Sequence, residues 1–120
     1  MKGVNNMYVL VVVLNAIDYL EDLLSSFVDE GISGATILES QGMGRAIVEN
    51  EHSKIPLFGA LKSVLEDAHP YSKTIFTVLE DEEVVDKAVT AVQKIISEES
   101  LSGAGFMFTI PIGKVYPMSE

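Results

Sequence analysis

Apolar residues recur along this chain with two different spacings. In the first run, 8–14, every residue is apolar or aromatic and most are β-branched, which is typical of a strand buried on both faces. Over 16–30 the apolar residues instead recur every three or four positions, which predicts an amphipathic helix. We expect Asn15 to cap the start of this helix and Gly31 to end it.

The same succession of strand and helix returns in the second half of the chain. A strand over 34–40 follows the first helix, and it is more polar than the first strand. Further strands are expected over 73–79 and 106–112, joined by a helix over 81–97 whose acidic first turn suits the positive end of the helix dipole. Because Pro111 has no amide hydrogen, the last strand should lie at an edge of the sheet.

This order of elements predicts an α+β fold, the ferredoxin-like βαββαβ sandwich. Right-handed crossovers would place the strands 8–14 and 73–79 at the centre of the sheet. The composition of the strand 8–14 agrees, because all of its residues are apolar or aromatic.

We expect a single domain over 1–120 with two less regular parts. Residues 1–6 are predicted to form a flexible leader. The insert over 41–72 is long for a structureless loop in a compact domain, which points to function or to local structure. Helical spacing of its apolar residues predicts a short helix over 57–66.

The two helices would cover only one face of a four-stranded sheet. The strand 8–14 is apolar on both faces, so the other face would be an apolar patch too large for a soluble monomer. Association of identical copies with closed symmetry would bury this patch. The alternative is that the helix of the insert covers it within one chain.

Charge and composition exclude several classes of function. The net charge of -10, with 8 basic against 18 acidic residues, opposes binding to nucleic acid and to acidic membranes. The absence of cysteine excludes disulfides, thiol nucleophiles and cysteine metal sites. The apolar run 7–14 has less than half of the roughly 20 residues needed to span a bilayer, so we expect a cytoplasmic protein without membrane insertion.

Three segments, in this order, resemble segments of the nitrogen regulatory PII signalling family and its PII-like relatives. The segment 34–45, G-A-T-I-L-E-S-Q-G-M-G-R, resembles the PII segment that ends in G-F-G-R. The segment 83–88 resembles the start of the family's second helix, and 102–108 resembles the stretch G-D-G-K-I-F-V that enters its last strand. The resemblance extends over about 7–116.

The resemblance implies a regulatory protein and not an enzyme. It implies a homotrimer whose sheets face inward, with a T-loop between strands two and three, here the insert 41–72. In the family, adenine nucleotides bind in clefts between subunits, and small effectors join them at the base of the loop. The output is a change in loop shape that alters binding to a protein target, so this insert would contact a partner protein.

The resemblance assigns five ligand-binding candidates. Gly42, Gly44 and Arg45 match the family's loop-base motif, and Gly103 and Gly105 match the two glycines of its B-loop. Glycines let backbone N–H groups approach an anion without obstruction by side chains. From the residues alone, Arg45 could equally form a surface salt bridge, and the two later glycines could be a plain turn.

The B-loop also departs from the family pattern. Its lysine position falls on Phe106, and the carboxylates Glu98 and Glu99 fall where the family has cationic or neutral groups. Like charges a few ångströms apart repel by about 1–4 kcal/mol near a protein surface. These two carboxylates therefore oppose the binding of a triphosphate. An adenine nucleotide remains a possible ligand, and no other cofactor is indicated.

Two other functions compete with this hypothesis. A divalent-cation-binding trimer of the copper-tolerance type shares the architecture. Its ligands would come from His52 and His69 together with carboxylates of the insert, although these residues also suit a solvated loop. The candidate carboxylates are Glu49, Glu51, Glu66 and Asp67. A ferredoxin-like enzyme or amino-acid-binding domain is the third possibility, but no catalytic, Rossmann or P-loop motif supports it.

Overall fold

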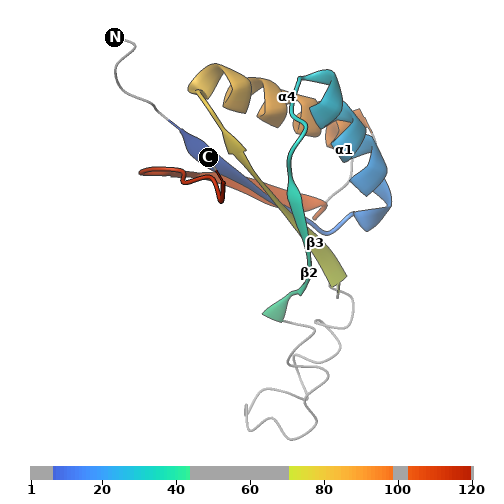
Figure 1. Ribbon diagram of the computed structural model, residues 1–120. Helices are drawn as coiled ribbons and strands as arrows, with labels where there is room; N and C mark the ends of the chain where they lie inside the picture. Colours follow the sequence, from blue (N-terminus) through green and yellow to red (C-terminus); the bar gives the residue numbers. More distant parts are fainter. Residues whose placement is uncertain (1–6, 44–70, 99–102, 120) are drawn as a thin grey trace, which may run out of the picture.

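A computed structural model describes residues 7–43, 71–98 and 103–119 of the chain. The elements within these ranges follow the predicted order of strands and helices (Figure 1). They are β1 (Tyr8–Leu14), the short 3₁₀ helix η1 (Ile17–Tyr19), α1 (Leu20–Asp29), β2 (Thr36–Gln41), β3 (Tyr71–Leu79), α4 (Glu82–Glu98) and β4 (Gly105–Pro111).

The four strands form one antiparallel sheet in the order β2-β3-β1-β4. Strands β1 and β3 are central, as predicted. Strand β4 is an edge strand and contains Pro111, which confirms the position inferred from the missing amide hydrogen. The expected α+β, ferredoxin-like fold is therefore confirmed.

Both helices lie on the same side of the sheet (Figure 1). On this side Val12 of β1 lies between Ile75 of β3 and Met107 of β4, its partners in the register. Alternate residues of the strands and the apolar stripes of the helices form one cluster, and their removal from water is the main stabilising contribution to the fold. The buried cluster consists of Leu10, Val12, Leu14, Leu23, Phe27, Ile32, Ile75, Leu79, Val85, Ala88 and Val92.

The first helix begins later than its sequence pattern predicted. The prediction that Asn15 caps it is wrong, because η1 intervenes and neither η1 nor α1 has a side-chain cap. The Asn15 side chain instead donates a hydrogen bond to the carbonyl oxygen of Gly103, 3.2 Å away. The second helix begins as expected, since the Asp81 carboxylate accepts a hydrogen bond from the Val84 amide at 2.9 Å.

The end of α1 is set by Gly31, as predicted. This glycine has φ +83°, and its amide donates to the Val28 carbonyl at 2.9 Å. The next amide, of Ile32, donates to the Phe27 carbonyl at 2.8 Å. This is the Schellman pattern, and the side chains of Ile32 and Phe27 are both buried in the core. The turn therefore directs the chain from the helix back toward the sheet.

Two predictions lie outside the described residues: the leader 1–6 and the insert helix 57–66. Of the insert predicted over 41–72, only its ends are described; Gln41 belongs to β2, while Tyr71 and Ser72 belong to β3. None of the helices in the described ranges combines the length and apolar character needed to cross a membrane.

Replacing Gly31 by alanine should lower the free energy of unfolding by about 1 kcal/mol, because a side chain is disfavoured at positive φ. Gly34→Ala is the matched control. Neither position has an atom within 4 Å of the new methyl group, but only Gly31 has positive φ. Urea unfolding at equal protein concentration compares the two. Equal losses of stability would show that backbone conformation does not explain the helix end.

Candidate functional site

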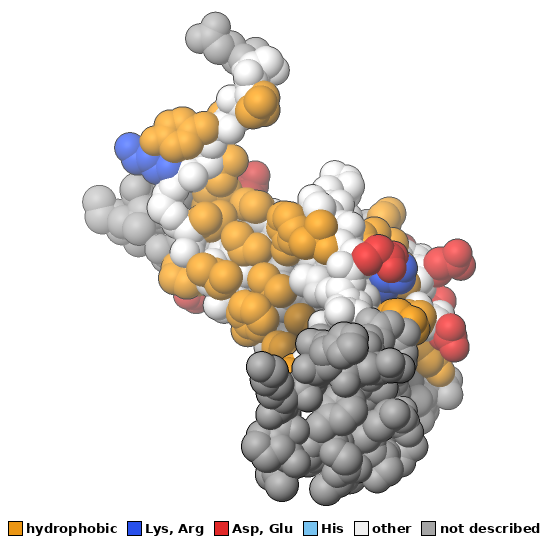
Figure 2. All heavy atoms as spheres, turned by 90° about the horizontal axis from the view of Figure 1, so that it is seen from below, with side chains coloured by type: hydrophobic (Ala, Val, Ile, Leu, Met, Phe, Trp, Pro, Cys, Tyr) orange, Lys and Arg blue, Asp and Glu red, His pale blue; other side chains and the backbone are white. Residues whose placement is uncertain are grey.

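The side of the sheet away from the helices carries mostly apolar side chains. We call it the open face. There Val11 of β1 lies between Phe76 of β3 and Phe108 of β4, its partners in the register. Figure 2 views the molecule from below, away from the helices, and shows hydrophobic side chains gathered across this surface. The face comprises Val9, Val11, Val13, Thr36, Leu38, Ser40, Ser72, Thr74, Phe76, Val78, Phe106, Phe108 and Ile110.

The open face has two properties that are unusual for a surface in contact with water. Large apolar side chains are exposed there, including Phe106 at 59% and Phe108 at 44%. The rings of these two residues stack with centroids 6.1 Å apart. No residue of the face is ionisable, although the chain has a net charge of -10. A contiguous apolar area of this kind is characteristic of an interaction surface.

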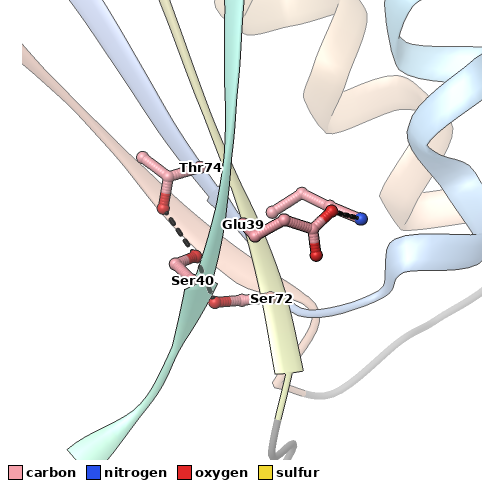
Figure 3. A network of polar contacts seen from close by, with 5 residues as sticks. Glu39, Ser40, Ser72 and Thr74 are labelled. Carbon is pink, nitrogen blue, oxygen red and sulfur yellow. Dashed lines mark hydrogen bonds and ion pairs between the residues drawn. The ribbon is translucent and has the colours of Figure 1, made fainter.

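Hydroxyl groups replace apolar side chains where the open face meets the insert (Figure 3). The Ser40 hydroxyl lies 2.7 Å from that of Ser72 and 2.9 Å from that of Thr74, so it hydrogen-bonds with both. On the opposite face, Lys73 forms an ion pair with Glu39. The strands β2 and β3 are therefore joined through side chains on both faces, next to the point where the insert leaves and returns.

The turn before β4 is held against the end of β1. The Ala104 carbonyl accepts hydrogen bonds from the amides of Asn15, at 2.7 Å, and Ala16, at 3.0 Å. Gly105 has φ +147°, and a Cβ atom there would lie 2.1 Å from the Val13 carbonyl oxygen. Glycine is thus required by the close approach of two backbones. A role of Gly103 and Gly105 in ligand binding stays a prediction.

The predicted ligand residues lie at opposite edges of the sheet. Gly42 follows β2, is exposed, and has no atom within 4 Å of the position of a Cβ. Gly105 begins β4 at the same end of the sheet, but β3 and β1 lie between the two edges. The β2 and β4 edges are three interstrand spacings apart, which is roughly 14 Å. The remaining two candidates, Gly44 and Arg45, lie outside the described residues.

This separation has a consequence for any small ligand. Within one chain, a molecule of a few ångströms cannot contact both Gly42 and the 103–105 turn. It would contact both only if the β2 edge of one copy lay beside the β4 edge of another. Among the described candidates, Gly42 and the 103–105 turn of one chain are therefore too far apart to share a small ligand.

The hydroxyl of Tyr8 lies at the other end of β1 and donates a hydrogen bond to the Glu82 carboxylate at 2.7 Å. This bond, followed by desolvation and the negative charge of Glu82, raises the pKa of Tyr8 above its usual value near 10. Tyr8 is therefore neutral at physiological pH. The contact connects β1 with the first turn of α4 and is distant from the glycine turn.

The hypothesis of a metal site rests on residues of the insert, all of which lie outside the described ranges. Within 7–43, 71–98 and 103–119 no group of three or more histidine or acidic residues could hold a metal ion. The structure therefore adds no support to a divalent-cation site.

Comparison with known families decides the assignment. The family model described as nitrogen regulatory protein P-II matches residues 7–119, nearly the whole chain. The chain belongs to the PII family. The family is regulatory, which agrees with the expectation of a signalling protein. No curated protein matches the chain.

A solved PII structure supports the same fold. The crystal structure of Arabidopsis thaliana PII bound to citrate is similar to this chain with a TM-score of 0.62. The match covers 98% of this chain and 88% of that chain at 15% sequence identity. The βαββαβ arrangement is thus a PII arrangement.

Sequence reasoning missed the side chains that hold the edges of this PII sheet in place. The sequence pattern predicts a helix cap at Asn15, whereas its contact with Gly103 depends on tertiary structure. Alternation along β3 would have placed Ser72 and Thr74 on the same face. Their contact with Ser40 follows only from the β2–β3 register, which the sequence pattern does not determine.

Gly105→Ala should reduce the free energy of unfolding by more than about 2 kcal/mol, because the new methyl group would overlap the backbone of β1. Gly113→Ala should change it by less than about 0.5 kcal/mol, since no atom lies within 4 Å of that position. Urea unfolding measures both. A stable Gly105→Ala variant would contradict the structural role and leave ligand binding as the reason for glycine.

Proposed function

We propose that this PII-family protein is a homotrimeric regulator that senses a small anionic ligand in the clefts between its copies. Its output would be altered binding of a partner protein through the insert 41–72, in the cytoplasm. The observation that carries this proposal is the combination of an uncharged, apolar open face with candidate ligand residues at opposite edges of one sheet.

The open face supports self-association. Each square ångström of apolar surface removed from water contributes about 25 cal/mol, and this face offers several aromatic and branched side chains at once. Copies with a charge of -10 repel each other, so they can approach closely only through surfaces that lack charge. Closed symmetry would bury all open faces around one axis and leave none exposed.

The edges of the sheet support a ligand site at the contact between copies. A closed ring of copies places one edge of each sheet beside the opposite edge of the next. Gly42, Gly44 and Arg45 follow the β2 edge, while the 103–105 turn begins the β4 edge. Arg45 is the only arginine of the chain, and its guanidinium suits carboxylate or phosphate groups.

The proposed ligand is a carboxylate or a nucleotide with few phosphates. The Arabidopsis PII structure is described as bound to citrate, a small polyanion. In this chain Glu98 and Glu99 precede the glycine turn, and their charges oppose the concentrated charge of a triphosphate. Citrate and adenosine monophosphate are therefore better probes than ATP.

Phe108→Asp should convert the protein into a monomer, because it places a charge in the middle of the proposed interface. Val28→Asp is the matched control. Val28 is also an exposed apolar residue, 66% against 44% for Phe108, but it lies on α1 and not on the open face. Light scattering should find a trimer for the wild type and the control. An unchanged mass for Phe108→Asp would contradict the proposed interface.

Calorimetric titration of the wild type with citrate, AMP, ADP and ATP should detect binding of at least one of the first three. Arg45→Ala should weaken that binding about tenfold or more. Arg45→Lys should restore part of it, because lysine returns the positive charge but not the planar guanidinium with its paired N–H donors. Absence of heat with every probe would contradict ligand sensing. Binding that is unaffected by Arg45→Ala would place the site elsewhere.

A further inference from the structure

The turn before β4 is held by a side chain as well as by the backbone. The Ala104 carbonyl accepts hydrogen bonds from the amides of Asn15 and Ala16. The preceding carbonyl, of Gly103, accepts one from the side-chain amide of Asn15 at 3.2 Å. Two consecutive carbonyl groups of the turn are therefore directed at the same place, the residues that follow β1.

The planarity of the peptide bond determines what lies on the other side of this turn. In a trans peptide the C=O of one residue and the N–H of the next point in opposite directions. Because the carbonyls of Gly103 and Ala104 point toward Asn15, the amides of Ala104 and Gly105 point away from it. Two neighbouring amides with a common direction form a donor pair that suits the oxygens of a carboxylate or a single phosphate group.

The register of β1 and β4 gives the same direction for the Gly105 amide. Backbone hydrogen bonds join Met7 with Ile112 at one end of the two strands and Asn15 with Ala104 at the other. Hydrogen-bonded and non-bonded pairs alternate along antiparallel strands, so Gly105 belongs to a non-bonded pair. Its N–H therefore points away from β1, toward the outer edge of the sheet, where the next copy of the proposed ring would lie.

The amide of Ala104 has no hydrogen-bond acceptor within the part of the chain that the structure describes. In a regular ladder it would donate to the carbonyl of Asn15, but that carbonyl accepts from the Ile17 amide at 2.9 Å instead. Ala104 is only 6% exposed. A buried N–H without an acceptor is unfavourable, and an anionic ligand would supply the acceptor.

We infer that Asn15 is a positioning residue for the proposed anion site: its side-chain amide holds the Gly103 carbonyl toward β1 and thereby turns the next two amides toward the ligand. This inference rests on the proposed ligand sensing. Gly103 has φ +69°, and glycine adopts positive and negative φ with similar ease. Without the Asn15 donor, the peptide that follows Gly103 could rotate with little penalty. The side chain therefore supplies the preorganisation that the glycines do not.

Asn15→Leu tests this role, because it keeps the branching of the side chain and removes its donor. Calorimetry should find that the variant binds citrate or AMP about fivefold or more weakly than the wild type does. Asn15→Gln, which carries the same amide on a longer side chain, should recover part of the affinity. Ser26→Ala is the matched control and should leave the affinity unchanged. Ser26 also donates to a backbone carbonyl, that of Leu23 at 2.7 Å, but it lies on α1.

Amide NMR provides a readout that a merely structural role would not move. In the wild type, citrate or AMP should shift the amide signals of Ala104 and Gly105, and in Asn15→Leu these shifts should shrink. Urea unfolding establishes that each variant is folded. If Asn15→Leu does not fold, Asn15→Ser replaces it, since a serine hydroxyl is too short to reach the Gly103 carbonyl.

Three results would overturn the inference: equal affinity of Asn15→Leu and the wild type, equal weakening by Ser26→Ala, or undiminished ligand-induced shifts at residues 104 and 105. The same titrations separate the two proposals. If the wild type binds a probe and Asn15→Leu binds it equally well, only the role of Asn15 is wrong. If the wild type binds none of the probes, ligand sensing fails and the role of Asn15 fails with it.

Discussion

The structure depends on a sheet whose central strand β1 is apolar on both faces while helices cover only one. Strand β1 directs Leu10, Val12 and Leu14 into the core, and the alternate valines lie on the open face. The first set stabilises the monomer. The second set is stabilising only if another surface covers it, and this requirement is the basis of the proposed self-association.

The position of the ligand candidates follows from the same sheet. The antiparallel order β2-β3-β1-β4 places the loop base and the glycine turn at one end of the sheet but at opposite edges. Contacts inside the chain fix both edges. The hydroxyl group of Ser40 joins β2 to β3, while Asn15 and the close approach at Gly105 hold β4 against β1. Rigid edges of this kind would let a ligand between copies affect the insert that continues from β2 and β3.

Sequence patterns predicted most of this architecture because they depend on local periodicity. The bounds of β1, the end of α1 at Gly31 and the edge position of Pro111 each follow from the conformational properties of nearby residues. The role of Asn15 was not predictable in this way. Its partner Gly103 is distant along the chain, and a capping residue and a tertiary donor look alike in sequence.

The candidate site was predictable only as a set of residue types. Glycines and a single arginine suggested an anion site, but the distance between the sheet edges became visible only with the strand order. The strand order depends on contacts between distant segments, which periodicity along one chain does not encode.

Sedimentation equilibrium of the unmodified protein tests the central claim most directly. The account predicts, at micromolar concentration, a species with three times the chain mass of 13.0 kDa. A single species of 13.0 kDa under these conditions would contradict it, because the open face would then be stable in water and no site between copies would exist.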